Sequence, residues 1–134
     1  MFYIKLEVDM NFINKINEFI QENKLSVGSI QYPDKSAVGT SSICAHVKDG
    51  KGIVYCHTSG KYQGKVFYVP SGIGWFYKSV LKGSQSQIGL PISDEIEICH
   101  AEKVKQVRFE VGLIEYDPLT NACQAMSVFK ETPL

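Results

Sequence analysis

The chain has 134 residues, of which 44% are hydrophobic, 11% are aromatic and 21% are charged. This length suffices to bury one hydrophobic core without disulfides or a metal, so the composition excludes a disordered chain and predicts a single domain over residues 1–134. Fourteen basic residues balance fourteen acidic ones, and without a field of one sign the chain is not expected to bind nucleic acid or anionic lipid.

The N-terminal segment, residues 1–25, predicts a strand followed by a helix. MFYIKLEV carries aromatic and β-branched residues in partial alternation, which indicates a strand, and Asp9 follows where a helix N-cap would stand. Apolar residues then recur with the period of a helix, namely Phe12, Ile13, Ile16, Phe19 and Ile20. We expect this stripe to pack against the rest of the domain or against a second copy of the chain, which makes a homo-oligomer one possible outcome.

The sequence has neither a candidate membrane span nor an export signal. It contains no run of about eighteen apolar residues, and its N-terminus lacks the basic start, apolar run and small-residue cleavage site of a signal peptide. The chain as it stands is therefore expected to be soluble and cytoplasmic, with no membrane partner.

After Leu25 the sequence consists of short β-rich runs separated by Gly, Pro, Asp and Ser, which is typical of hairpins. The expected strands are SVGSIQYP, SSICAHV, GIVYCH, KVFYV, EIEICH, KQVRFEV and LIEY. One short helical turn fits between Trp75 and Leu81. The pattern predicts an α+β fold made mainly of antiparallel β-strands in two repeat units, with one N-terminal amphipathic helix.

The two repeat units are predicted from internal similarity. Residues 64–82 align with residues 112–130 at a shift of 48, with six identities in nineteen positions. YCH, residues 55–57, also echoes ICH, residues 98–100. The expected units are residues 37–82 and 83–130.

The second unit resembles an LGFP repeat, a family that combines a strand pattern, R-F-x-x-G-x-I-Y-W-S-P-x-T-G-A, with a turn pattern, L-G-x-P-x-S-D-E. The strand pattern is matched by Arg108, Phe109, Gly112, Ile114, Tyr116, Pro118, Thr120 and Ala122. The turn pattern is matched by Ile88, Gly89, Pro91, Ser93, Asp94 and Glu95. Asn121 departs from the family because it stands where Gly is usual. The resemblance covers residues 65–126 and implies a β-rich repeat used for attachment or binding, in a family usually associated with the cell wall.

The turn SQIGLPISDE, residues 86–95, has a physical reading of its own. Gly89 can adopt a positive φ without steric cost, and Pro91 biases Leu90 to an extended conformation. Asp94 is suited to accept hydrogen bonds from backbone N–H groups. Adjacent carboxylates on a strand point to opposite faces, so we favour a structural role for this turn over acid–base catalysis by Asp94 and Glu95.

The cysteines and histidines do not form a recognisable catalytic or metal-binding pattern. The spacings between Cys44, Cys56, Cys99 and Cys123 match no CxxC motif, so reduced thiols are expected. Cys56 with His57, and Cys99 with His100, are strand neighbours that face opposite ways; we expect buried Cys and exposed His. A cross-strand pair such as Cys56 with His100, which would suit a cysteine-dependent enzyme, stays open. No metal and no cofactor are expected from these residues or from His46.

The aromatic residues supply the candidate binding site. They are clustered in sequence, as Tyr62, Phe67, Tyr68, Trp75, Phe76 and Tyr77. Of these we expect Trp75, Tyr77 and Tyr68 to contact a ligand, because aromatic side chains bury much area at small entropic cost. Arg108 is the candidate charged anchor, unless it pairs with a glutamate across the sheet.

These observations favour a non-enzymatic binding module for a glycan or another small polar molecule. The alternative is a protein-interaction or inhibitor subunit, which sequesters a partner protein or self-associates through the N-terminal helix.

Overall fold

The computed structural model describes residues 2–98 and 103–127, with side chains described from Met10 onward. A long helix comes first, followed by three strands, a group of short helices and four further strands. The elements are α1 (Phe2–Glu22), β1 (Ser42–Val47), η1 (Lys48–Gly50), β2 (Gly52–His57), β3 (Val66–Pro70), α2 (Ser71–Trp75), η2 (Phe76–Val80), η3 (Gly83–Gln85), β4 (Ile96–Glu97), β5 (Lys105–Phe109), β6 (Gly112–Asp117) and β7 (Ala122–Ser127).

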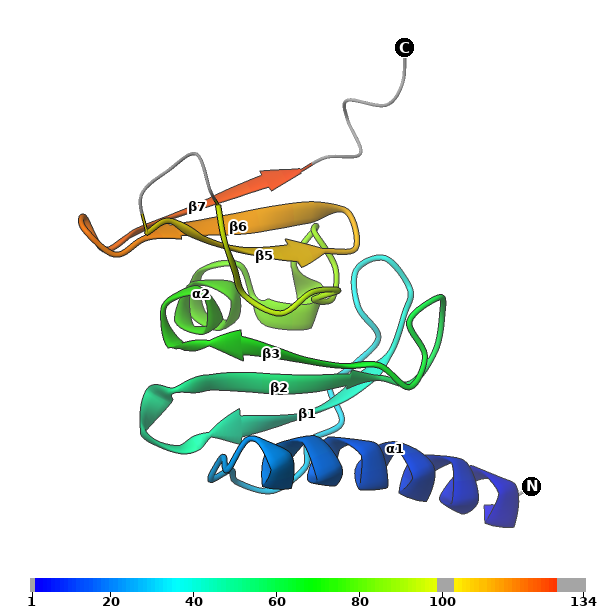
Figure 1. Ribbon diagram of the computed structural model, residues 1–134. Helices are drawn as coiled ribbons and strands as arrows, with labels where there is room; N and C mark the ends of the chain where they lie inside the picture. Colours follow the sequence, from blue (N-terminus) through cyan, green and yellow to red (C-terminus); the bar gives the residue numbers. More distant parts are fainter. Residues whose placement is uncertain (1, 99–102, 128–134) are drawn as a thin grey trace.

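The strands form two antiparallel sheets, which confirms the expected α+β fold with mainly antiparallel strands. The first sheet has the order β1-β2-β3 and the second has the order β4-β5-β6-β7. Figure 1 shows α1 on the outer face of the first sheet, and the short helix α2 between the two sheets. The segment that follows α2 thus connects the sheets and fills the space between them.

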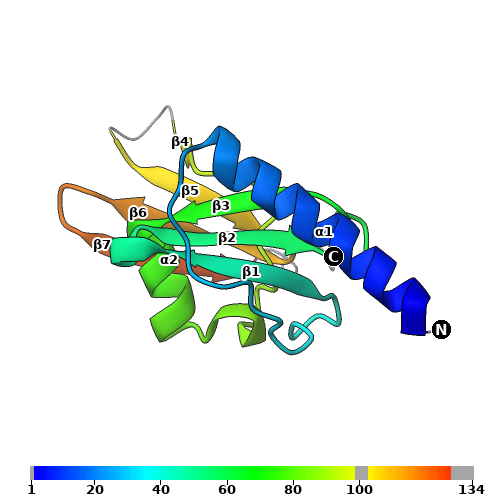
Figure 2. The same cartoon turned by 90° about the horizontal axis from the view of Figure 1, so that it is seen from below.

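Helix α1 covers the first sheet because both surfaces are apolar on the faces that meet. Seen from below in Figure 2, the helix crosses the sheet, and it contacts all three strands. The buried residues of this interface are Phe12, Ile16, Ile20, Ile43, Ala45, Val47, Val54 and Cys56. Along β1 and β2 they alternate with residues that point to the second sheet, as the two-residue period of a strand requires.

The expected strand at residues 1–8 is wrong, because α1 begins at Phe2. The residue expected as its N-cap, Asp9, lies inside the helix. Positions 4, 8, 12, 16 and 20 are all apolar, so the spacing of four that marks the later part of the helix also extends to its beginning. This continuous spacing favours one long helix over the local β-propensity of the first eight residues.

The apolar stripe of α1 is occupied by the chain's own sheet. Phe12 is 5% exposed and Ile16 is fully buried. Burying an aliphatic side chain of this size stabilises a fold by roughly 1.5–3 kcal/mol. Phe12 and Ile16 therefore pack on the first sheet, and self-association through the N-terminal helix stays a prediction.

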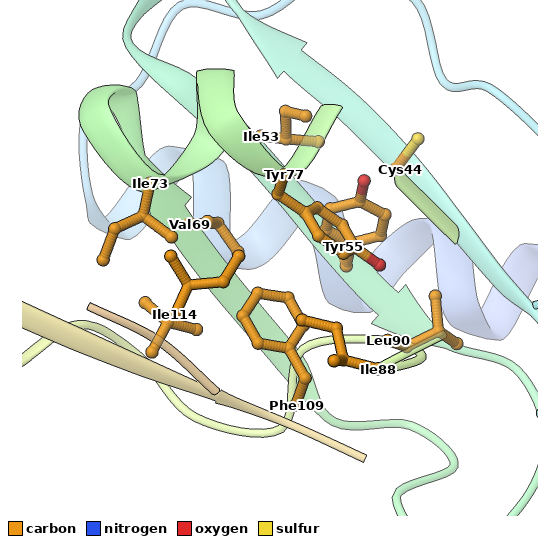
Figure 3. Packing of buried hydrophobic residues seen from close by; sticks show 11 residues of the cluster. Cys44, Ile53, Tyr55, Val69, Ile73, Tyr77, Ile88, Leu90, Phe109 and Ile114 are labelled. Atoms are coloured by element: carbon orange, nitrogen blue, oxygen red, sulfur yellow. The ribbon is translucent and has the colours of Figure 1, made fainter. Parts of the chain in front are cut away.

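A second cluster of buried residues holds the two sheets together (Figure 3). Tyr77 from η2 lies at its centre, with its ring centroid 4.6 Å from that of Phe109 and 5.9 Å from that of Tyr55. The other members are Cys44, Ile53, Val69, Ile73, Ile88, Leu90, Val107 and Ile114. Because both sheets and the segment between them contribute, this cluster forms a core common to the two halves.

The turn at residues 86–92 enters this core and is held there by hydrogen bonds. Gly89 has a φ of +82°, and its carbonyl accepts a hydrogen bond from the Tyr77 hydroxyl at 2.6 Å. The Glu110 carboxylate accepts from the Leu90 N–H at 2.8 Å. The His57 ring is fully buried, contrary to the expectation of an exposed histidine, and its Nε2 donates to the Pro91 carbonyl at 2.6 Å. These contacts support the structural reading of the turn.

Asp94 also has a structural partner, since its Oδ1 accepts a hydrogen bond from the Tyr68 N–H at 3.1 Å. This bond ties the connection before β4 to strand β3, so the acidic part of the turn joins the two sheets.

The expected strands agree with most of the sheet, with two differences. Residues 26–33 form only isolated bridges, from Val27 to Val47 and from Gln31 to Cys44. Strand β7 was not expected, because ACQAMS has neither β-branched nor aromatic residues.

The predicted repeat units correspond only in part. β3 ends at Pro70 and β6 ends just before the aligned Pro118, but a helix follows the first proline, whereas a turn and then a strand follow the second. Cys99, His100 and residues 128–130 lie outside the described residues. The division into units at residues 37–82 and 83–130 stays a prediction.

Among the described residues, no helix has the length and apolar character needed to cross a membrane.

Candidate binding site around Trp75

The segment that carries Trp75 begins as an α-helix and continues as a π-helical turn. α2 begins directly after Pro70 and continues into η2, a π-helical turn in which the Leu81 N–H donates to the Phe76 carbonyl at 3.1 Å. Ile73 and Tyr77 point into the core, while Trp75 lies on the exposed side. π-Helical turns occur frequently at functional sites, and here one starts at the residue after the exposed indole.

Gly74 holds this helix close to the first sheet. A Cβ at this position would lie 2.9 Å from the Val69 carbonyl oxygen and 3.2 Å from the Gly52 Cα. Only a glycine fits such an approach between helix and strand backbones. Because one side of the helix is pressed onto β2 and β3, the neighbouring Trp75 side chain is directed outward.

Trp75 is 62% exposed and borders two pockets. The first, which we call the Tyr116 pocket, has a volume of about 410 Å³. It is lined by Gly72, Trp75, Phe76, Val80, Tyr116, Asn121 and Cys123. This pocket lies where the β6–β7 hairpin of the second sheet meets the α2–η2 segment, so it forms only when the second sheet packs on that segment.

The second pocket, which we call the His46 pocket, has a volume of about 300 Å³. It is lined by His46, Val47, Gly50, Gly52, Ile53, Gly74, Trp75, Lys78 and Ser79. The first five of these residues come from the β1–β2 hairpin and the other four from the α2–η2 segment. The indole of Trp75 thus stands between a pocket on the first sheet and a pocket on the second.

Tyr116 and Asn121 bring polar groups to the lining of the Tyr116 pocket. The Tyr116 hydroxyl donates to Asn121 Oδ1 at 2.8 Å, which leaves the Asn121 amide N–H groups and the Tyr116 oxygen lone pairs for other partners. Asn121 has a φ of +59°, a conformation that Asn and Gly adopt more readily than other residues. Asn is therefore well suited to this position of the turn between β6 and β7.

The His46 pocket is basic. Burial lowers the pKa of His46, and the positive charge of Lys78 lowers it further. The imidazole is therefore neutral near pH 7, and Lys78 carries the positive charge. In the described part of the chain Lys78 makes no ion pair; the salt bridge found there joins Lys105 to Glu97 at 2.8 Å.

The structure separates the residues that the sequence placed in one site. Trp75 is exposed as expected, but Tyr77 is fully buried and donates its hydroxyl to a backbone carbonyl, so it is not available to a ligand. Tyr68 packs with the α1 cluster on the other face of the first sheet. Arg108 lies on β5, lines neither pocket beside Trp75, and its Nε donates to Gln106 Oε1 at 3.3 Å.

Among the described thiols, the buried Cys44 and Cys56 are not arranged for nucleophilic chemistry. Cys56 points toward α1, whereas His57 points toward the second sheet. Burial raises the pKa of Cys44 and the pKa of Cys56 to about 11 in each case, so both are protonated thiols near neutral pH. Within residues 10–98 and 103–127, no group of three or more His, Cys, Asp and Glu side chains is arranged to hold a metal ion.

Sequence reasoning missed most of the residues that surround Trp75. Lys78 and Ser79 follow Trp75 at offsets of three and four, and this helical spacing was a usable signal once a helix was expected there. His46, Tyr116 and Asn121 come from hairpins distant in the sequence. Their proximity to Trp75 depends on how the two sheets pack together, and no local sequence pattern predicts that packing.

No protein-family model matches the chain, and a search of curated proteins finds no match. The resemblance to LGFP repeats therefore stays a prediction from the residues quoted above.

Proposed function

We propose that the protein is a non-enzymatic binding module that recognises a glycan or another small polar ligand at Trp75. The observation that carries the proposal is an indole 62% exposed between two pockets. Leaving so large an apolar surface in water is unfavourable, and a ligand that covers it recovers that free energy. Polar groups on both sides, from Tyr116, Asn121 and Lys78, provide the few oriented contacts that small-ligand sites combine with apolar walls.

The proposal is tested with a panel of immobilised neutral and acidic oligosaccharides. We expect the protein to retain at least one of them, and we expect Trp75→Ala to weaken that binding by at least about tenfold, which corresponds to about 1.4 kcal/mol. The matched control is Tyr32→Ala, which removes an aromatic side chain that is 59% exposed and lines neither pocket. Both variants should keep the unfolding midpoint of the unmodified protein. Equal binding by Trp75→Ala and the unmodified protein would contradict the proposal.

A protein partner is the second candidate, favoured by an apolar continuation of the same surface. Val80 is 48% exposed and borders a groove of about 350 Å³ that also includes Leu81, Ile88 and Met126. A stable protein interface buries about 1,000 Å² or more and would have to extend over this groove. Met126→Lys should therefore weaken a protein complex but leave binding of a small glycan at Trp75 unchanged.

A further inference from the structure

The His46 pocket differs from the Tyr116 pocket in its charge. Its lining contains the Lys78 ammonium and the His46 imidazole but no carboxylate. Asp49, the acidic residue nearest to it in sequence, belongs to η1 and is not part of the lining. A ligand group bound in this pocket would therefore contact the positive charge of Lys78, and no carboxylate in the lining neutralises that charge.

Lys78 and His46 come from different elements and face the same space. Lys78 belongs to η2 and His46 belongs to β1. Both residues line the same pocket, and in keeping with this the charge of Lys78 adds to burial in lowering the pKa of His46. His46 is half-buried and Lys78 is exposed, so a ligand can reach the ammonium from solvent and the imidazole from within the pocket.

We propose that the His46 pocket binds a carboxylate group of the ligand, so that the molecule held against Trp75 is an acidic glycan such as a uronic-acid saccharide. This inference rests on the proposed function, because it concerns one end of the same ligand. Lys78 provides the charge, and Ser79 and the neutral His46 ring provide hydrogen-bond donors. Gly50 and Gly52 also line the pocket and bring no side chain into it, which leaves room for the acid group.

A carboxylate fits this pocket better than a phosphate. Lys78 supplies one compact positive charge, which matches the single negative charge of a carboxylate. The pocket contains no Arg and therefore lacks the planar fork that binds phosphate through two parallel hydrogen bonds.

The test compares cellobiouronic acid with cellobiose, two disaccharides that differ at one carbon, by titration calorimetry. The unmodified protein should bind the acid about tenfold more tightly, the size expected for one charge-assisted contact. Lys78→Met should abolish the preference, because it weakens binding of the acid about tenfold more than binding of cellobiose. Lys35→Met, which removes an exposed lysine that lines neither pocket beside Trp75, should retain the preference. This control separates a local contact from a general effect of charge.

The outcomes distinguish the inference from the proposal on which it rests. If the protein binds the two sugars with equal affinity and Trp75→Ala abolishes both, the carboxylate site is refuted. The proposal of a binding module at Trp75 is then unaffected. Binding of neither sugar, or binding that persists in Trp75→Ala, would count against the module itself. Loss of the acid preference in Lys35→Met would show that the preference does not depend on the pocket and would also overturn the inference.

Discussion

Tyr77 and Trp75 are two residues apart and belong to different environments. The Tyr77 ring is fully buried beside Phe109, and its hydroxyl satisfies the carbonyl of Gly89. Burial is the largest cause that raises the pKa of Tyr77 well above its usual value, so the phenol stays protonated and acts as a donor. The residue holds the turn at Gly89 against the core and takes no part in ligand contact.

This assignment predicts the effect of removing one oxygen atom. Tyr77→Phe should lower the free energy of unfolding by about 1–2 kcal/mol, because the buried Gly89 carbonyl loses its donor while the ring packing is kept. Chemical denaturation measures the loss. Oligosaccharide binding by the folded variant should be unchanged, and a loss of affinity at full stability would place Tyr77 in the site after all.

The type of side chain predicted which residues could contact a ligand, but it did not predict which of them would be exposed. Trp75 was expected to contact a ligand, and its side chain is exposed beside two pockets. Tyr77 and Tyr68 share its aromatic character, and composition does not distinguish an exposed aromatic residue from a buried one. Arg108 was singled out as the lone arginine, but Lys78 is the cation beside the indole, and one lysine among thirteen has no distinguishing signal in the sequence.

At the scale of the element, the position of Trp75 depends on the close approach of α2 to the first sheet. The backbone around Gly74 lies against Val69 and Gly52 with no space for a methyl group. Any side chain at this position has to push the helix away from the strands, and the indole moves with it.

Gly74→Ala is therefore expected to destabilise the protein. Alanine has the higher helix propensity, worth up to about 1 kcal/mol, but the clash with the Val69 carbonyl should cost about 1–3 kcal/mol, so the net change is a loss. The measurement is again the free energy of unfolding. Gly28→Ala is the matched control: a Cβ there meets nothing within 4 Å, and stability should change little or rise. An unfolding free energy for Gly74→Ala equal to or above that of the unmodified protein would show that the helix is not held by this contact.

Elements were predictable where periodicity and turn residues agreed. β2, residues 52–57, has the expected bounds, and β1, β3, β5 and β6 lie close to theirs. The first eight residues were misassigned because short-range alternation suggested a strand, whereas the spacing of four along the whole segment belongs to a helix. β7 gave no signal, because it is an edge strand of largely small and polar residues that is stabilised by pairing with β6.

At the scale of the whole molecule, the candidate site forms because the two sheets pack on either side of the segment that connects them. α1 covers one face of the first sheet, and the second sheet covers the other through a common core (Figures 1 and 3). This arrangement brings the β6–β7 hairpin to one side of Trp75 and the β1–β2 hairpin to the other. The fold class followed from strand and turn patterns, but the two pockets did not, because their residues meet only once both sheets are packed on the connecting segment.

The central claim is that a ligand covers Trp75, and the protein provides its own probe because Trp75 is its single tryptophan. The decisive measurement is therefore a fluorescence titration with cellobiouronic acid. Free protein should show the long-wavelength emission of an exposed indole, and added sugar should shift or quench that emission until it saturates, with the same affinity as calorimetry gives. An emission spectrum that does not change while calorimetry records binding would place the ligand elsewhere and contradict the account.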